Sequence, residues 1–359
     1  MNLIYTYDIF SAQKYGGISR YFYELIRRIS SHGAQVRVPA GLYINEYAKG
    51  LNALNGLKVP PIPYTGFIRK KINKLLQKVM LQSSDDETII HQTYYYPFSF
   101  PKKAKLVVTV YDMIHERFHP SLVDASNIKR KSCKRADMII AISHSTKNDL
   151  VELFGIDPQK VTVIHLASSL RESPMRPDTE AFSEPYMLYV GERKGYKNFD
   201  GLIKAFSQSK MLMDNFHIIC FGGSSFEKRE MDLFKKTGVA SLLHQVSGGD
   251  AYLASHYRKA SAFVCPSLYE GFGLPLLEAM SLSCPVICSN TSSIPEVAGD
   301  AAVYFDPNDI SSIQRALEDA LFDKDLLVDL KRRGLERELI FSWDKCANET
   351  LAVYNSLLQ

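Results

Sequence analysis

The chain lacks any C-x-x-C pair among its six cysteines, and most of these cysteines lie in short apolar runs. Such spacing is not that of a disulfide framework. Free cysteines in apolar runs are usually buried thiols of proteins kept in a reducing compartment. We therefore expect buried free thiols. The residues are Cys133, Cys220, Cys265, Cys284, Cys288 and Cys346.

Long hydrophobic runs and a strong charge excess are also absent. No apolar stretch reaches the roughly 18 residues that a membrane-spanning helix needs. The first residues show no basic region followed by an apolar one, so no signal peptide is expected. The net charge of +4 is small for 359 residues and argues against a nucleic-acid partner. We therefore expect a cytoplasmic protein.

Several catalytic motifs are missing as well. Neither G-x-x-x-x-G-K-[ST] nor G-x-S-x-G occurs, which argues against P-loop and α/β-hydrolase chemistry. One zinc-protease pattern, H-E-x-x-H, does occur at residues 115–119. That chemistry needs both histidines on one face of a helix, and Pro120 follows the second histidine at once. We therefore expect no long helix and no zinc site at this place.

The chain does contain a regular alternation of short apolar runs and longer amphipathic ones. This βαβα rhythm predicts an α/β fold with doubly wound parallel sheets covered by helices on both faces. The length favours two domains. A polar, proline-containing stretch interrupts the rhythm, so we expect a domain at 1–168, a linker at 169–185 and a second domain at 186–340.

The expected strands and helices follow from this rhythm. The strands are residues 3–7, 88–91, 106–111, 138–142, 161–164, 187–191, 217–221, 262–265, 286–288 and 302–305. Examples of the helices are residues 18–31, 143–154, 199–209 and 253–260. In open α/β sheets, ligands bind beyond the carboxyl ends of the strands, so the loops that follow the strands are the places to search for a site.

Residues 267–285 are the most informative segment of the chain. Glu270 and Glu278 stand eight positions apart, Gly271 and Gly273 follow the first, and an apolar run that predicts a helix comes next. A helix start presents backbone N–H groups to an anion. Two carboxylates can accept hydrogen bonds from hydroxyl groups. An anion combined with many hydroxyls describes a nucleotide sugar.

A second loop fits the same ligand. The cations at positions 193, 194 and 197 directly follow the strand predicted at 187–191. Arg193 can bind two phosphate oxygens at once, and Lys197 can act as a point charge. A solvated charged loop is the alternative interpretation, but the position after a parallel strand favours a phosphate site.

Three weaker candidates for contacts to the nucleotide sugar each lie in a turn next to a strand or helix. Gly16 and Gly17 open a helix and let backbone amides approach a phosphate or a sugar. Gly222 follows a strand and Ser247 precedes a helix, where main-chain groups can hold a base and a ribose. The helix start at 292–296 can meet a diphosphate. For each, a turn without a binding role is the alternative that the sequence leaves open.

The segment around the two glutamates resembles the E-x(7)-E signature of glycosyltransferase family 4, whose members are retaining enzymes of the GT-B fold. The resemblance is strong in the C-terminal half and extends in outline to nearly the whole chain. The matching stretches are 253–260, 263–267, 270–278, 285–289, 295–302 and 189–198, and then 16–17, 107–114 and 136–143.

The resemblance implies two Rossmann-like domains that face each other across a cleft. The first would bind the acceptor, the second the nucleotide sugar, and residues 341–359 would form a helix that crosses back to the first domain. Glu278 would accept hydrogen bonds from the ribose, and Glu270 would lie beside the transferred sugar. The loop between them would grip sugar and diphosphate through its main chain. The residues of this loop are Gly271, Phe272, Gly273 and Leu274.

The resemblance also implies the chemistry. Arg193 and Lys197 would neutralise the departing diphosphate, which gains negative charge in the transition state. Retaining members are thought to react on one face of the sugar, so no protein nucleophile and no metal cofactor would be required.

One departure from the family pattern concerns the first domain. Many members have a histidine before the aspartate that follows the strand predicted at 106–111, and this chain has Tyr111 there. His115 can take the place of that histidine, or it can be a loop histidine without a role. His91 lies near the expected cleft, and the tyrosines at 94–96 can stack on an acceptor sugar or simply pack.

Residues 67–81 predict a basic amphipathic helix. One interpretation is that this helix lies on an anionic membrane surface. The other is a domain helix whose apolar stripe faces the core. Its apolar positions are Ile68, Ile72, Leu75, Leu76 and Val79, and its basic positions are Arg69, Lys70, Lys71, Lys74 and Lys78.

From these observations we expect a retaining, metal-independent hexosyltransferase that uses a nucleotide diphosphate sugar. GDP-mannose is the favoured donor, and the expected acceptor is a saccharide, either free or linked to a lipid such as polyprenyl diphosphate. The expected pathway is surface polysaccharide synthesis, such as that of O-antigen, at the inner face of the cell membrane. The alternatives are a non-catalytic sugar-nucleotide-binding scaffold and a sugar-nucleotide epimerase or phosphorylase of the same fold.

Overall fold

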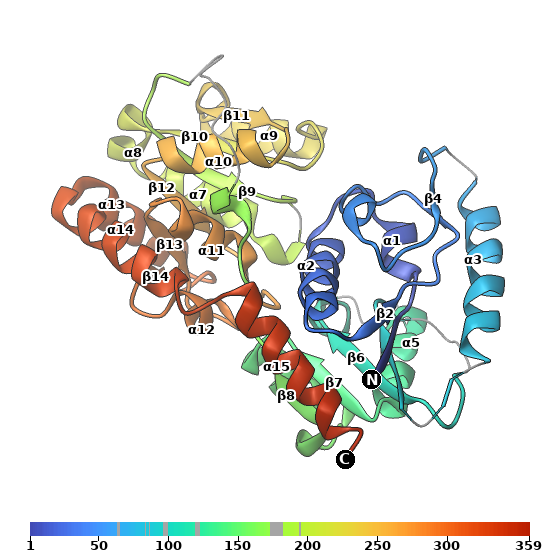
Figure 1. The fold of residues 1–359 in the computed structure, drawn as a ribbon. Coiled ribbons are helices and arrows are strands. Elements are labelled where there is room, and N and C mark those ends of the chain that lie inside the picture. The colour runs from blue at the N-terminus through green and yellow to red at the C-terminus, as the bar shows by residue number, and fades with distance from the viewer. Residues whose placement is uncertain are drawn as a thin grey trace. The chain divides into compact units, whose positions relative to one another are not determined.

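The structure is a computed structural model that describes the chain except for residues 63–64, 83, 86, 96–99, 119–122, 173–181 and 194, and except for the side chains of residues 123–125 and 172. The described residues form two compact units, shown in Figure 1. Unit 1 comprises Met1–Leu166 and Trp343–Gln359, and unit 2 comprises Ala167–Ser342.

Unit 1 is built on a six-stranded parallel sheet. The sheet order is β2 (Gln35–Arg37), β1 (Asn2–Tyr5), β5 (Thr88–Gln92), β6 (Lys105–Val110), β7 (Met138–Ala141) and β8 (Val161–Val163). The order reverses between β1 and β5, and ligands of doubly wound sheets bind beyond the carboxyl ends of the strands at such a switch point. A separate parallel pair joins β3 (Leu42–Tyr43) to β4 (Leu57–Lys58).

Helices cover both faces of this sheet. They are α1 (Asp8–Ala12), α2 (Gly17–Ser31), α3 (Gly66–Leu81), α4 (Ile114–Phe118), α5 (Val123–Arg135), α6 (His144–Phe154) and α15 (Trp343–Ser356), with 3-10 helices η1 (Tyr47–Gly50) and η2 (Pro158–Lys160). The ends of α6 show why its residues form a helix. The Ser143 hydroxyl caps its start by accepting a hydrogen bond from the Thr146 N–H, and Gly155 ends it in the left-handed region.

The last helix of the chain, α15, belongs to unit 1 and packs against α2. Its Tyr354 hydroxyl lies 2.9 Å from the Tyr5 hydroxyl and 2.5 Å from Nδ1 of His91. These groups are buried and would be costly to leave without partners, so the network fixes α15 on the sheet.

Unit 2 is built on a second six-stranded parallel sheet. The sheet order is β11 (Leu243–Val246), β10 (His217–Phe221), β9 (Tyr186–Val190), β12 (Ala262–Cys265), β13 (Val286–Ser289) and β14 (Ala302–Phe305). The order reverses between β9 and β12, so the loops after these two strands meet at the switch point of unit 2.

The helices of unit 2 also lie on both faces of its sheet. They are α7 (Phe199–Ser207), α8 (Lys210–Asn215), α9 (Lys228–Thr237), α10 (Asp250–Lys259), α11 (Leu274–Ser281), α12 (Ile294–Ala298), α13 (Ile310–Phe322) and α14 (Lys324–Glu338), with 3-10 helices η3 (Leu170–Glu172), η4 (Gly195–Lys197) and η5 (Ala240–Leu242). One buried apolar cluster joins α7, α8, α9 and α13 to the sheet.

The expected α/β class and the doubly wound parallel sheets are confirmed. The ten predicted strands are present, with ends that shift by at most two residues. The sequence did not reveal β2 or β11, because these edge strands carry polar residues such as Gln35 and Gln245 and lack a continuous apolar run. Of the predicted linker, residues 173–181 lie outside the described residues, and η3 belongs to unit 2.

All six cysteines are buried free thiols, as expected. In the part of the chain that the structure describes, no helix combines the length and the apolar character needed to cross a bilayer.

Candidate active site

An ion pair lies at the switch point of unit 2. Lys197 ends η4 after β9, Glu270 lies in the loop after β12, and Lys197 Nζ is 2.7 Å from Glu270 Oε1. Burial alone would lower the pKa of Lys197, but the Glu270 carboxylate outweighs it and raises this pKa above its ordinary value. Lys197 is therefore positively charged at neutral pH.

Serine hydroxyls hold Glu270 in place. The Ser267 hydroxyl donates to Glu270 Oε1 at 2.6 Å. The Glu270 N–H donates to the Ser292 hydroxyl at 2.8 Å, and the Ser293 hydroxyl donates to the Glu270 carbonyl at 2.8 Å. The helix start at 292–296 stays a predicted phosphate contact through its N–H groups, and the structure shows its serine hydroxyls bonded to the Glu270 backbone. Sequence reasoning missed Ser267, although its place directly after β12 was the available signal.

The loop after Glu270 turns sharply into α11. Gly273 precedes the helix with φ of 98°, and a Cβ atom there would lie 2.7 Å from Leu276 Cδ1. Both the backbone angle and the lack of space require glycine. Gly271 and Phe272 are buried, and Leu274 is the first helical residue. The loop from Glu270 thus runs directly into α11, where Pro275 has no N–H and the Leu276 N–H donates to the Gly273 carbonyl at 2.9 Å.

Glu278 lies on α11 and is almost completely buried. The Tyr257 hydroxyl donates a hydrogen bond of 3.2 Å to Glu278 Oε2. Burial, and then the nearby Glu278 charge, raise the pKa of Tyr257 well above its ordinary value, so the phenol stays protonated and remains a donor. The sequence predicted the glutamate but not this tyrosine, which comes from α10.

Arg193 occupies a different position from the one expected. Its guanidinium is buried, with Nε 2.7 Å from Glu230 Oε1, and it donates to the carbonyls of Gly222 at 3.3 Å and Ser224 at 2.6 Å. A Cβ atom at Gly223 would lie 2.8 Å from its Nη1. Arg193 thus fixes the loop after β10, whereas Lys197 is the cation paired with Glu270. Lys194, the third expected cation, lies outside the described residues.

The loops after β10 and β11 are joined by the main chain. The Gly222 N–H donates to the Val246 carbonyl at 2.9 Å, which brings Gly222 next to Ser247. Ser247 is exposed, and Gly222 adopts φ of 85°. The structure therefore brings these two candidates together at the carboxyl edge of the sheet.

In unit 1, Gly16 and Gly17 form the start of α2. A Cβ atom at Gly16 would lie 2.4 Å from Gln13 Oε1, and that oxygen accepts a hydrogen bond of 3.3 Å from the Ser19 N–H. Gln13 therefore partly caps α2. Nothing lies within 4 Å of a Cβ atom at Gly17, so the backbone there is open to approach.

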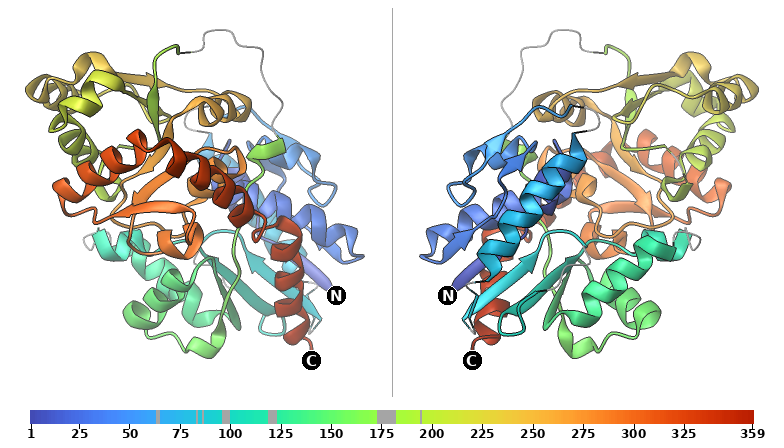
Figure 2. Two further views of the ribbon diagram at one scale, coloured as in Figure 1. Left: turned by 90° about the vertical axis from the view of Figure 1, so that its left-hand side faces the viewer. Right: turned by 90° about the vertical axis from the view of Figure 1, so that its right-hand side faces the viewer.

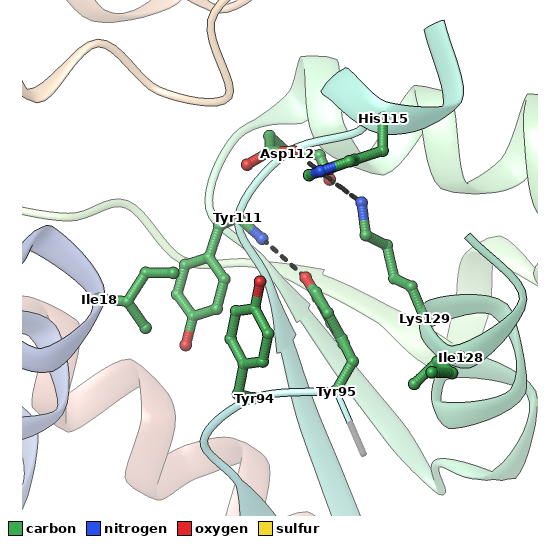
Figure 3. A pocket seen from close by; sticks show the side chains of 8 residues that line it. All are labelled: Ile18, Tyr94, Tyr95, Tyr111, Asp112, His115, Ile128 and Lys129. Carbon is green, nitrogen blue, oxygen red and sulfur yellow. Dashed lines mark hydrogen bonds and ion pairs between the residues drawn. The ribbon is translucent and has the colours of Figure 1, made fainter. Parts of the chain in front are cut away.

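A pocket of about 190 Å³ lies in unit 1 beyond the carboxyl ends of β5 and β6 (Figure 3). Its walls combine aromatic rings with ionisable side chains. The Tyr111 N–H donates to the Tyr95 hydroxyl at 3.4 Å, and the ring of Tyr94 lies 5.2 Å from that of Tyr95. The lining residues are Ile18, Tyr94, Tyr95, Tyr111, Asp112, His115, Ile128 and Lys129.

A second buried ion pair lies beside this pocket. Lys129 Nζ is 2.8 Å from Glu116 Oε2 and 3.0 Å from the Asp112 carbonyl. Glu116 is the acidic residue of the H-E-x-x-H pattern, and the structure uses it as the partner of Lys129. His115 lines the pocket on the short helix α4, and His119 lies outside the described residues.

His91 was expected near the cleft, and this expectation is wrong in its detail. The side chain is 1% exposed, and its Nε2 lies 2.8 Å from the Thr109 hydroxyl, while Nδ1 faces Tyr354. Burial lowers the pKa of His91 to about 3, so the ring is neutral at physiological pH. His91 is a core residue of unit 1.

Unit 2 therefore offers a fixed cation, a helix start and two buried carboxylates around one switch point. This combination suits a ligand that carries both negative charge and hydroxyl groups.

Two family models match the chain. The model described as "Glycosyl transferases group 1" matches residues 174–337, and the model described as "Glycosyltransferase Family 4" matches residues 15–167.

Curated relatives are 30% identical to the chain over the aligned residues. O-antigen chain mannosyltransferase B of Escherichia coli is 30% identical over 279 residues, which cover 72% of this chain and 73% of that protein. O-antigen chain mannosyltransferase RfbU of Salmonella typhimurium is 30% identical over 230 residues, which cover 63% of this chain and 57% of that protein.

Solved structures show the same fold at low sequence identity. Sucrose-phosphate synthase from Thermosynechococcus elongatus has a TM-score of 0.76 at 18% identity and covers 99% of both chains. WaaG, a glycosyltransferase of lipopolysaccharide biosynthesis, has a TM-score of 0.73 at 16% identity and covers 98% of this chain and 99% of its own. Anabaena HepE, solved with UDP and glucose, has a TM-score of 0.74 at 15% identity and covers 99% of this chain and 100% of its own.

Proposed function

Because the chain belongs to the glycosyltransferases of group 1 and family 4, with the GT-B fold, we propose that it transfers a hexose from a nucleotide diphosphate sugar to a saccharide with retention of the anomeric configuration. The observation that carries this proposal is the Lys197–Glu270 pair at the switch point of unit 2.

In the proposed reaction, Lys197 and the amides of Gly273 and Leu274, at the entry to α11, stabilise the leaving diphosphate. The bond between the anomeric carbon and the diphosphate oxygen breaks, so negative charge grows on the diphosphate in the transition state. A fixed cation and oriented N–H groups are worth most where that charge develops. The burial of Lys197 and its bond to Glu270 hold the ammonium group in place before the donor arrives.

The two glutamates orient the donor. Glu270, held by Ser267 and by its backbone contacts, accepts hydrogen bonds from hydroxyls of the transferred sugar. Glu278, held by Tyr257, accepts hydrogen bonds from the ribose. Arg193 positions the loop after β10, through Gly222 and Ser224, for the nucleoside. Ser247 and the amides of Gly16 and Gly17 remain proposed contacts.

The pocket of unit 1 supplies the acceptor subsite in this proposal. Sugar rings present C–H faces that stack on aromatic side chains and hydroxyls that bond to carboxylates. Tyr94 and Tyr95 offer such rings, and Asp112 and His115 offer polar groups. Tyr111 also lines this pocket, and its hydroxyl donates to the Thr93 carbonyl at 3.5 Å.

The proposed donor is GDP-mannose and the proposed acceptor is a lipid-linked saccharide of surface polysaccharide synthesis, at the cytoplasmic face of the membrane. The similarity to two O-antigen chain mannosyltransferases supports this choice. The same reaction proceeds without a metal, because Lys197 and the amides provide the positive charge that a metal ion would supply.

A donor screen tests this proposal. The purified chain is mixed with UDP-, GDP- and dTDP-sugars and with octyl glycosides of mannose, glucose and N-acetylglucosamine, and release of nucleoside diphosphate is measured with and without EDTA. We expect acceptor-dependent release from GDP-mannose that EDTA does not reduce, and a product whose NMR coupling constants show retention.

Glu270→Ala is the test variant and Glu336→Ala, an exposed glutamate of α14, is the matched control. We expect the first to lose nearly all transfer and the second to keep it. Donor binding without transfer to any acceptor would favour the scaffold alternative, and inactivation by EDTA would overturn metal independence.

A further inference from the structure

The helix α3 turns two uncharged polar residues inward and most of its apolar residues outward. Asn73 is 0% exposed and Gln77 is also buried, whereas Leu75 is 65% exposed. This arrangement is the reverse of an ordinary domain helix, so the interpretation in which the apolar stripe faces the core is wrong. The exposed apolar side chains of α3 are Phe67, Ile68, Ile72, Leu75, Leu76 and Val79.

Specific hydrogen bonds fix this orientation. The Asn73 side chain accepts a hydrogen bond from the Leu42 N–H at 2.9 Å and donates one to the Leu42 carbonyl at 2.7 Å. It thus satisfies both backbone groups of Leu42, as the backbone of a neighbouring strand would. Arg69 Nε donates to the carbonyl of Ser11 at 3.1 Å and to its hydroxyl at 3.0 Å. Because buried polar groups are costly to leave unpaired, the helix cannot rotate its apolar face inward without losing these bonds.

The exposed face is also strongly basic. Lys70, Lys71, Lys74 and Lys78 are exposed, and no acidic residue occurs between Gly66 and Leu81. Lys71 Nζ lies 4.5 Å from the centre of the Phe67 ring, so cations and apolar side chains are interleaved. The right-hand view of Figure 2 shows that no described element of unit 1 covers the outer side of α3.

From this geometry we propose that the outer face of α3 docks on an anionic lipid surface. Apolar side chains enter the boundary between headgroups and acyl chains, and lysines on the same helix meet the anionic headgroups. An apolar face of this kind is unusual on the water-exposed surface of a protein and marks an interaction site. Leu57 and Ile62, just before α3 in the chain, are exposed as well and extend the apolar surface.

The charge of the face selects lipid over a second copy of this chain. A symmetric dimer would place the same patch on both sides of the interface, and the lysines of one α3 would then face those of the other. Without any acidic residue on the helix, nothing there compensates that repulsion. A bilayer containing anionic lipid offers both an apolar layer and negative charge.

This inference rests on the proposed function, because lipid docking brings the chain to its proposed lipid-linked acceptor. Arg69 and Asn73 attach α3 to Ser11 of α1, which directly follows the carboxyl end of β1. The tyrosine-lined pocket lies beyond the carboxyl ends of β5 and β6 in the same sheet. Docking through α3 would therefore hold the acceptor edge of unit 1 near lipid-linked saccharides.

Vesicle co-sedimentation tests this inference. The full chain is mixed with vesicles of phosphatidylcholine alone or of phosphatidylcholine with phosphatidylglycerol. We expect binding to the anionic vesicles only. The triple variant Lys71→Glu, Lys74→Glu, Lys78→Glu should weaken this binding at least about tenfold, and Leu75→Ser with Val79→Ser should weaken it by a similar factor.

Matched controls carry the same changes on unit 2. The control for charge is a triple variant on α9, which changes the net charge by the same amount: Lys228→Glu, Lys235→Glu, Lys236→Glu. The control for apolar surface removes two side chains of similar exposure: Val328→Ser with Leu339→Ser. Both should bind as the unchanged chain does. Circular dichroism of each variant shows whether it is folded.

Three results would overturn the inference. They are equal binding by the α3 variants and their controls, no binding of the unchanged chain to anionic vesicles, and a dimer in sedimentation equilibrium that the Leu75 and Val79 changes dissociate. Vesicle binding needs neither donor nor acceptor. If vesicle binding fails while nucleoside diphosphate release with octyl glycosides persists, only the lipid inference is wrong. If the chain binds vesicles but releases no nucleoside diphosphate, only the proposed transfer is wrong.

Discussion

The two units carry the same kind of ion pair at the carboxyl edges of two similar sheets. In unit 1, Lys129 pairs with Glu116 at 2.8 Å, and both side chains are 5% exposed. In unit 2, Lys197 pairs with Glu270 at 2.7 Å, and these side chains are 18% and 12% exposed. The first pair lies beside an aromatic pocket, and the second lies at a switch point next to a helix start.

This difference indicates that a buried Lys–Glu pair does not by itself mark a ligand-binding site. The unit 1 pair is almost fully buried and joins α4 to α5, although Lys129 also lines the pocket, so we expect its main effect to be on stability. The unit 2 pair keeps more access to solvent and is followed in the chain by α11, which carries Glu278, so we expect it to exchange its internal contacts for those of a ligand. Four predictions test whether the two edges differ in this way.

The largest effect should come from the cation of unit 2. Lys197→Met removes the charge that stabilises the leaving diphosphate, and we expect kcat to fall by about 10²–10³, as for the loss of one oxyanion donor. Transfer kinetics measure this effect. Lys235→Met, an exposed lysine on α9, should leave kcat unchanged. Equal losses in both variants would mean that Lys197 has no special role.

The next effect concerns the pair of unit 1. Lys129→Met leaves a buried carboxylate without its partner, so the free energy of unfolding should fall by about 3 kcal/mol. The single tryptophan, Trp343, belongs to unit 1, and its fluorescence in urea follows the unfolding of this unit. Adding Glu116→Gln should restore part of the loss. A stable Lys129→Met variant with impaired chemistry would reverse the assigned roles of the two pairs.

The third prediction uses the neutral histidine of unit 1. His91 has a pKa of about 3 in the folded chain against 6.5 for an ordinary histidine, so below pH 6.5 the unfolded chain binds a proton that the folded chain does not. Stability is therefore lost as the pH falls, by about 1.4 kcal/mol per pH unit between about 6 and 4. His91→Gln should remove this slope from the Trp343 unfolding curves, and His32→Gln, at an exposed position, should retain it. An unchanged slope in His91→Gln would contradict the role of the buried network.

The smallest effect should come from the pocket of unit 1. Tyr94→Ala removes a stacking surface, so KM for the acceptor should rise about tenfold, a change of about 1.4 kcal/mol, while KM for the donor stays the same. Tyr94→Phe keeps the ring and should behave as the unchanged chain. A selective rise of the donor KM would place the donor, not the acceptor, in this pocket.

Much of the fold and part of the site could be predicted from the sequence because the relevant patterns are local. Buried parallel strands produce continuous apolar runs, and loops after such strands meet at one edge. This reasoning placed Lys197 in the loop after a strand, and the structure brings it into contact with Glu270 although 73 positions separate them.

The remaining features depend on partners that no local pattern reveals. The buried Glu230 on α9 engages Arg193, and Tyr354 on α15 engages His91 across 263 positions. The helical period of α3 showed an apolar face but not which face is inward, because the bonds of Asn73 to Leu42 decide that.

Calorimetric titration with GDP tests the central claim most directly, because it asks whether the edge of unit 2 binds a nucleoside diphosphate through Lys197. The account predicts binding to the unchanged chain and to Lys235→Met, and at least about a tenfold loss of affinity in Lys197→Met, consistent with removal of one charge-assisted contact. Equal affinities in all three proteins, or no binding of GDP, UDP or dTDP to any of them, would contradict it.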